Sequence, residues 1–270
     1  MKYIGYTLLV FIAIAAYAFK SGGDSVIITP SQKFIEKEFT VGNFNEIEVS
    51  SGIKVNFTQS TGAIKVVANC PDNLIDRLDV KNDNGELKIR YKKGTRVSYN
   101  GQNAKHVTFE ISAPALKEVD LSGASGFSAQ SLNSKDFSVD LSGASSFKVE
   151  SFEAANAEFE LSGASVVNLT NAKIADGEFD LSGASTVKVN NYTGEKGDIE
   201  ASGASTVDMV GKVTTLKLYL SGASTAKLAN LGVDNAGVNL TGASTARTNI
   251  KNIDLISASG SSKVTNKAAK

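Results

Sequence analysis

A short motif recurs along the chain and constrains its fold more than any other feature. Leu-Ser-Gly-Ala-Ser at 121–125 returns with small variations about every twenty residues, as far as 258–262. The repeated glycines are Gly123, Gly143, Gly163, Gly183, Gly203, Gly222, Gly242 and Gly260. A unit of this length cannot bury a core alone, so such repeats are typical of proteins that stack one unit on the next.

Apolar and polar residues alternate on both sides of each repeated glycine. The positions four and two residues before it are apolar in every copy, as Val119 and Leu121 are in the first. A period of two indicates strands with one buried face rather than a helix. We therefore predict an all-β fold, a right-handed parallel β-helix (β-solenoid) of about eight rungs of ~20 residues, capped by an N-terminal β region.

The Ser-Gly-Ala-Ser segment is interpreted as the sharp corner that joins two strands of each rung. A repeated bend needs a residue without a Cβ at positive φ, and close stacking leaves room only for small neighbours. The second serine forms a column that starts at Ser125 and continues through every copy. We expect its hydroxyls to bond along the rod and to the backbone of the bend. A row of nucleophiles is the alternative, but no His or Lys base recurs beside these serines.

The chain divides into five segments by pattern. The region before the repeats is strand-like, with a degenerate rung at 47–55, a hairpin around the turn at 82–85, a short helical turn at 73–76 and a polar loop at 92–105. The predicted segments are a signal peptide or N-terminal anchor at 1–18, a linker at 19–34, an N-terminal β cap with degenerate first rungs at 35–105, the repeat β-helix at 106–262 and a polar C-terminal tail at 263–270.

An apolar run opens the chain and predicts export. It extends from Tyr3 to Phe19 and is followed by a polar stretch, with Ala16-Tyr17-Ala18 in the small-x-small pattern of a cleavage site. This length and pattern favour a cleaved signal over a retained anchor, which stays the alternative. In either case we expect the rest of the chain outside the cytoplasm, in the periplasm, on the outer surface or secreted. It would touch a membrane only through this segment, if uncleaved.

Composition removes several classes of function. The 270 residues include one Cys, one His and no Trp, and 28 Lys and Arg balance 28 Asp and Glu. A disulfide framework and a His- or Cys-rich metal site therefore lack ligands. The basic excess typical of nucleic-acid binders is absent, so we predict no nucleic-acid partner. His106 precedes Val107 on the outward phase, so we interpret it as a surface residue rather than a lone catalytic base.

Acidic residues occupy two outward columns over five consecutive repeats. Three residues before the glycine stand Asp120, Asp140, Asp180, Glu160 and Glu200, and five residues before it stand Glu118, Glu158, Glu178 and Asp198. Stacked carboxylates about 5 Å apart repel one another, and a divalent cation such as calcium, or a partner, would relieve that repulsion. The alternative is a solvated face that keeps the rod soluble. Lys217 and Tyr219 end the stripe in the next repeat.

The serial Leu-Ser-Gly-Ala-Ser rungs, the strand-rich region at 47–55 and the signal-like start together resemble the autotransporter adhesin head GIN domain family, typical of Bacteroidetes. The resemblance covers about residues 35–262. It implies a right-handed β-helix that is exported and has an adhesive or surface-associated role, and it brings no catalytic residue to this chain.

These observations predict an exported, non-enzymatic protein in surface adhesion or cell-envelope interaction, with surface glycans or with host or envelope proteins as partners. A structural envelope component is one alternative. A polysaccharide-binding or polysaccharide-degrading β-helix is the other, because a glycosidase needs two opposed carboxylates and the acidic columns supply candidates. The aromatic residues Tyr192 and Tyr219 are scattered in the sequence, and they offer no recurring platform for a sugar.

Overall fold

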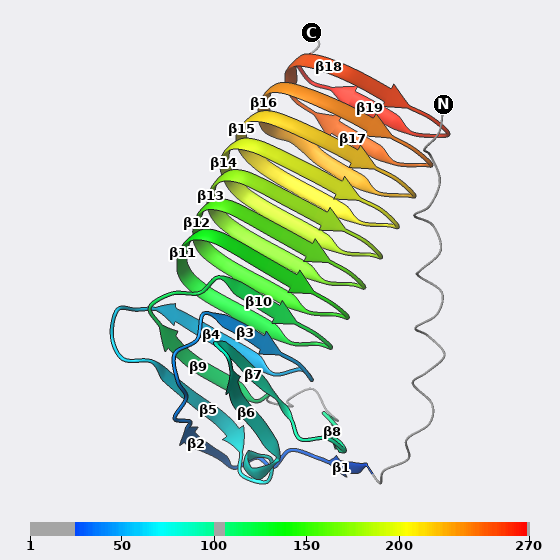
Figure 1. Cartoon of the computed structure of the whole chain (residues 1–270). Coiled ribbons are helices and arrows are strands. Elements are labelled where there is room, and N and C mark those ends of the chain that lie inside the picture. Colours follow the sequence, from blue (N-terminus) through cyan, green and yellow to red (C-terminus); the bar gives the residue numbers. More distant parts are fainter. Residues whose placement is uncertain (1–24, 100–105, 269–270) are drawn as a thin grey trace, which may run out of the picture.

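Stacked coils of β-strand form a rod, and a smaller β-region closes its N-terminal end (Figure 1). This computed structural model describes residues 25–99 and 106–268. The predicted parallel β-solenoid is confirmed, since each turn pairs in parallel with the turns before and after it. In the described part of the chain no helix has the length and apolar character needed to cross a membrane. The apolar run and the predicted signal peptide lie outside the described residues.

Each turn of the rod except the last is one strand that runs from corner to corner, rather than the two strands expected, and the last turn is divided into β17 and β18. The strands of the solenoid are β10 (Glu118–Leu121), β11 (Gly126–Leu141), β12 (Ser146–Leu161), β13 (Val166–Leu181), β14 (Thr186–Ala201), β15 (Thr206–Leu220), β16 (Thr225–Leu240), β17 (Thr245–Thr248), β18 (Ile250–Ala258) and β19 (Lys263–Asn266). The eight corner glycines bound seven turns, so the predicted count of eight rungs is one too many.

The burial pattern divides every coil into two faces. In β11 the inward residues alternate along 126–129 and again along 137–141, and paired exposed residues at 130–131 and 135–136 mark a bend between them. We call the stretch that follows a corner the first face and the stretch that leads into the next corner the second face. A broad bend joins the two faces opposite the sharp corner (Figure 1).

The corner has the geometry that the motif predicted. All eight repeated glycines have φ between 68° and 75°, the left-handed region that favours glycine. The amide of the following residue donates to the carbonyl of the glycine one turn below, as from Ala184 to Gly163 at 2.7 Å. This ladder brings successive corners so close that the turns stack backbone on backbone.

Seven corner serines, from Ser125 to Ser244, are fully buried, and Ser262 on the last turn is partly exposed. Ser165 Oγ donates to the Ser162 carbonyl at 2.8 Å, and Ser185 and Ser205 repeat this bond to Ser182 and Ser202. These hydroxyls satisfy the backbone of the bend, as expected, whereas Ser224 Oγ has no partner in the described residues, and the column does not form a chain of hydroxyl bonds along the rod. Burial places the seven serines away from any substrate, so their role is structural.

Aromatic rings fill the first turns of the interior. Phe159 stacks on Phe179 with ring centroids 5.0 Å apart and planes 2° apart, and its edge meets Phe147 and Phe152. Identical positions in successive turns lie about one strand spacing apart, which is the separation that offset stacking requires. The rod core is thus ordered by the same register that aligns its surface columns.

The N-terminal region continues both faces of the solenoid and then closes them. Its elements are β2 (Phe34–Glu38), β3 (Glu46–Val49), β4 (Lys54–Gln59), β5 (Lys65–Pro71), the 3-10 turn η1 (Ile75–Arg77), β6 (Leu78–Asp83), β7 (Glu86–Tyr91) and β9 (Thr108–Ala113). Strands β3 and β4 pair in parallel with β10 and β11, which confirms the degenerate rung. The corner between β3 and β4 has Ser51, with φ 70°, at the position that the repeated glycine occupies in the solenoid.

Three short strands lie where the sequence predicted irregular chain. Strand β1 (Val26–Ile28), inside the predicted linker at 19–34, pairs with β8 (Thr95–Val97), inside the predicted loop at 92–105. Strand β19 lies in the predicted polar tail at 263–270, because Lys263–Asn266 still finds β17 to pair with. Each of these strands depends on a partner distant in sequence, which local pattern does not reveal.

The last turn exposes apolar positions that the repeat pattern assigned to the core. Ile256 stacks on the buried Val238 but is itself 47% exposed, and Ala258 is exposed as well. Within the described residues no further turn covers them. Their position in the column is therefore as predicted, and their burial is not.

Tyr192 is expected to be a site where a substitution stabilises the protein. Its hydroxyl is buried, finds no hydrogen-bond partner in the described chain, and has a pKa raised by that burial. Tyr192→Phe should raise the free energy of unfolding by about 1 kcal/mol, because it removes an unsatisfied polar group. Tyr91→Phe is the matched control: its hydroxyl bonds Tyr99 at 3.0 Å, so its loss should destabilise. Urea unfolding of both variants measures these changes, and a destabilised Tyr192→Phe would contradict the conclusion that the Tyr192 hydroxyl is unsatisfied.

Candidate functional site

The register of the coils aligns the predicted carboxylates into two straight columns on the second face. The near column, three residues before each corner glycine, runs Asp120, Asp140, Glu160, Asp180, Glu200. The far column, five residues before it, runs Glu118, Ser138, Glu158, Glu178, Asp198. All nine carboxylates predicted from the sequence thus lie side by side on consecutive turns.

Both columns continue into the N-terminal region, where the sequence did not predict them. Glu48 pairs with Asp120 and Glu46 with Glu118, and one strand further stand Glu86 and Lys88. Lys88 Nζ lies 3.3 Å from Glu48 and 2.8 Å from Glu86, so a cation terminates the stripe at this end. Glu46 and Glu48 flank the apolar Ile47 in the sequence, and this alternation could have placed both of them on the outward side of their strand.

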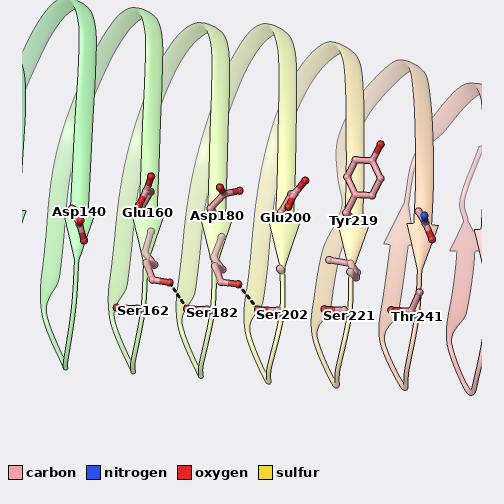
Figure 2. A pocket seen from close by; sticks show the side chains of 15 residues that line it. Asp140, Glu160, Ser162, Asp180, Ser182, Glu200, Ser202, Tyr219, Ser221 and Thr241 are labelled. Carbon is pink, nitrogen blue, oxygen red and sulfur yellow. Dashed lines mark hydrogen bonds between the residues drawn. The ribbon is translucent and has the colours of Figure 1, made fainter. Parts of the chain in front are cut away.

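A groove runs along the rod between the near column and the corners. Its volume is about 630 Å³, and it crosses the turns from β11 to β16. One wall is the near column and its continuation, and the other is the serine before each corner glycine (Figure 2). The polar lining residues are Asp140, Glu160, Asp180, Glu200, Tyr219, Asn239, Ser162, Ser182, Ser202, Ser221 and Thr241. We call this feature the corner groove.

The serine wall of the corner groove is held in place by the backbone. Ser182 Oγ donates to the Leu161 carbonyl at 3.3 Å, and Ser202 Oγ donates to Leu181 in the same way (Figure 2). Each hydroxyl oxygen keeps its acceptor lone pairs free on the groove side. The groove thus presents acceptors at the regular spacing of the turns.

The carboxylates of the corner groove have no cationic partner in the described chain, in contrast to two acidic residues nearer the broad bend. In the far column Asp198 pairs with Lys217 at 3.2 Å, and beside it Asp176 pairs with Lys196 at 3.2 Å. Within the described residues no Lys, Arg or His lies within ion-pair distance of Asp140, Glu160, Asp180 or Glu200. The corner groove therefore carries uncompensated negative charge, and in the described ranges Glu118, Glu158 and Glu178 of the far column form no ion pair either.

Burial and like-charge repulsion raise several pKa values along the columns. Burial, and then Asp140 and Glu48, raises the pKa of Asp120 to about 6. Burial, and then Glu200 and Glu178, raises the pKa of Asp180 to about 6. The pKa values of Asp140, Glu118 and Glu158 are raised as well, in each case first by burial.

The acidic columns should make the protein more stable in mild acid. A raised pKa in the folded state means that the folded state binds protons more tightly than the unfolded chain does. The stability from Asp120 and Asp180 is therefore complete below about pH 4 and is lost as pH rises through about 6. Because both groups are partly solvated, we expect only about 1 kcal/mol each.

Urea unfolding at pH 7.5 and pH 5 measures this effect. The wild type should have the higher midpoint at pH 5, and Asp180→Asn should raise the midpoint at pH 7.5 and reduce the difference between the two conditions. A wild type that loses stability between pH 7.5 and 5 would show that the columns do not repel as described.

The columns form a line rather than a cage for a metal ion. In residues 25–99 and 106–268, no group of three or more His, Cys, Asp or Glu side chains is arranged to hold a metal. Successive carboxylates stand one turn apart along the rod, so each neighbours others on one line rather than around a common centre. The calcium interpretation stays a prediction.

The other candidate residues lie outside the corner groove. His106 is exposed, as predicted, and its ring contacts the ring of Tyr99 at 4.4 Å in the N-terminal region. Cys70 is buried in β5, and burial raises its pKa to about 12, so it is not a reactive thiolate at neutral pH.

Two groove residues were missed because their repeats depart from the acidic pattern. Tyr219 and Asn239 continue the near column after Glu200, in register on β15 and β16. Tyr219 is 44% exposed, so the aromatic residue that seemed scattered in sequence lies in line with the carboxylates (Figure 2). The sequence placed Tyr219 at the end of the acidic stripe, but it gave no sign of the groove that this residue lines.

Solved structures share the fold along most of the chain. A protein of Parabacteroides merdae described as a putative adhesin superposes with TM-score 0.79 at 18% identity, covering 89% of this chain and 98% of its own. A second putative adhesin, from Parabacteroides distasonis, gives TM-score 0.75 at 18% identity over 90% and 98%. A putative lipid binding protein of the same organism gives 0.68 at 14% over 89% and 99%.

Sequence comparison identifies the family. No curated protein matches the chain. The family model described as "Putative auto-transporter adhesin, head GIN domain" matches residues 43–210 and 170–269, which together span the N-terminal region and the whole solenoid. The chain therefore belongs to the auto-transporter adhesin head GIN domain family.

Proposed function

We propose that this protein is an exported, non-enzymatic adhesin that acts at the cell surface and binds its partner through the corner groove. The family membership supports an adhesive role, and the apolar N-terminal run supports export. A stacked solenoid supplies a rigid, elongated platform, which suits contact with an extended partner.

One observation carries the proposal: the row of uncompensated carboxylates in the corner groove. Asp140, Glu160, Asp180 and Glu200 have no cationic partner in the described residues and repel one another at a cost in stability, although lysines pair with Asp176 and Asp198 on the same turns. Binding sites commonly retain such destabilising arrangements because their polar groups are kept for contact with the partner. A concave surface of about 630 Å³ is also in the size range of ligand sites.

Surface location is the first requirement of an adhesin, and protease treatment of intact producing cells tests it. The full-length protein should be degraded in intact cells, while a periplasmic marker protein stays protected. Complete protection of this protein in intact cells, with degradation after the envelope is opened, would overturn the adhesin assignment and favour a structural envelope component.

A further inference from the structure

We propose that Tyr219 is the aromatic platform of a sugar-binding subsite in the corner groove, which takes a neutral pyranose chain laid along the rod. This inference rests on the proposed function and names the chemical class of its ligand. It is carried by an exposed aromatic ring, its two neighbours in the column and the spacing of the turns.

Tyr219 stands out among the exposed side chains. The large apolar residues with high exposure in the described chain are Val26, Ile27, Val210, Tyr219, Leu255 and Ile256, and Tyr219 is the aromatic one. Its ring stands beside Glu200 in the row of near-column side chains that line the groove (Figure 2). A half-exposed tyrosine in a hollow offers a flat apolar face together with a polar tip, which is the pattern of a recognition residue.

The neighbours of Tyr219 supply the hydrogen-bonding groups that a sugar ring needs. Glu200 on one side is a carboxylate acceptor, and Asn239 on the other offers both a carbonyl and an amide donor. Ser221 and Thr241 add hydroxyls across the groove. A pyranose ring has an apolar C–H face and a rim of hydroxyls, so stacking on Tyr219 would direct its rim to these groups.

The spacing of the turns suits a polymer rather than a single sugar. Successive groove residues repeat at the strand spacing of about 4.8 Å, which is close to the length of one ring in an extended 1,4-linked pyranose chain. Each ring would meet one turn of β12 to β16.

Charge restricts the class of glycan. The four carboxylates of the groove have no cationic partner, so a uronic-acid polymer would be repelled, whereas neutral hydroxyls find acceptors. A lysine-rich peptide would satisfy the same charges, and its ammonium groups could also lie over the ring of Tyr219. The amide of Asn239 and the hydroxyls of Ser221 and Thr241 beside the ring are the groups that the rim of a sugar needs, so the surroundings of Tyr219 favour a sugar chain, and a lysine peptide enters the test as the competing ligand.

Titration of the full-length protein with four hexamers tests the subsite. The four probes are hexamers of 1,4-linked glucose, 1,4-linked N-acetylglucosamine, galacturonic acid and lysine. Calorimetry measures the binding of each probe, and saturation transfer to the sugar protons detects contact with the sugars. We expect at least one neutral hexamer to bind. Tyr219→Ala should weaken it by about tenfold or more, and Tyr219→Phe should change it by less than about threefold. Leu255→Ala, which truncates another exposed apolar side chain at the rod end, should have no effect.

Three outcomes would overturn the inference. They are no binding of either neutral hexamer, equal binding by Tyr219→Ala and wild type, and tighter binding of the lysine or galacturonic acid hexamer than of the neutral ones. Tyr219 is exposed, so its variants should fold, and an unchanged unfolding midpoint verifies this. If the protein is degraded on intact cells and yet no neutral hexamer binds, the adhesin function stands and the sugar subsite falls.

Discussion

Replacing Gly183 by alanine is expected to destabilise the protein by about 3 kcal/mol, the combined cost of a left-handed non-glycine residue and an overpacked contact. Gly183 has φ 71°, and a Cβ atom there would lie 2.5 Å from the Gly163 carbonyl oxygen. That oxygen accepts the Ala184 amide, so relief of the clash would also break the corner ladder. The corner is backbone on both sides, and neither partner has a flexible side chain to move.

Gly237→Ala is the matched control for the corner. Gly237 lies on the second face of β16, and a Cβ atom there would meet nothing within 4 Å. The control should therefore change the free energy of unfolding by less than about 0.5 kcal/mol. Urea unfolding followed by circular dichroism compares the two variants. Equal midpoints would mean that the corner tolerates a side chain and that the repeated glycine has another cause.

Replacing Phe159 by alanine is expected to cost about 3–5 kcal/mol, the usual range for a large aromatic residue in a core. The ring is fully buried, stacks on Phe179 at 5.0 Å and meets Phe152 edge-on at 5.9 Å. Its removal leaves a cavity between turns that are held in register by their backbone ladder, so the walls have little freedom to collapse.

Phe159→Leu separates the cavity from the loss of a particular ring. Leucine keeps an apolar group in the same column, so we expect a smaller cost, about 1–2 kcal/mol. Hydrogen exchange should place the loss in β12 and β13, because each turn contacts only its neighbours. A change spread evenly from β11 to β18, or a cost below about 1 kcal/mol for the alanine variant, would contradict this description of the core.

The solenoid could be predicted from sequence because its determinants are local and repeated. The glycine at each corner and the apolar residues at two and four positions before it recur in every copy, and together they specify corner, strand phase and stacking register. The two acidic columns followed directly, since outward residues at the same position of each repeat must align. For the same reason the nine carboxylates were placed correctly without a structure.

Features that depend on chain ends or distant partners could not be predicted in this way. Glu48 joins the near column through a corner where Ser51 replaces glycine, about seventy residues before Asp120. Strands β1 and β8 pair across a similar distance, so neither carries a local signal. Ile256 has the sequence position of a core residue but lies on the last turn, where burial would need a further turn to cover it.

The corner groove itself emerges only when the coils are stacked. Its walls combine the near column with the serines before the corners, two positions that the sequence separates by a buried residue. Tyr219 belongs to it because the turn of β15 is in register with its neighbours, although its repeat is one residue shorter. The pairing of Asp176 and Asp198 with lysines, and the lack of a cationic partner along the groove in the described part of the chain, likewise required coordinates.

The central claim is that the corner groove is the adhesive surface, and binding of protein-coated beads to target surfaces tests it most directly. Beads would carry the wild-type full-length protein, a groove variant (Glu160→Lys with Glu200→Lys) or a control (Glu153→Lys with Glu195→Lys). The control makes the same charge change at exposed positions of the broad bend. Wild-type and control beads should bind equally to cells or envelope preparations, and groove-variant beads should lose about tenfold or more. Equal binding by all three would show that adhesion, if present, uses another face of the rod.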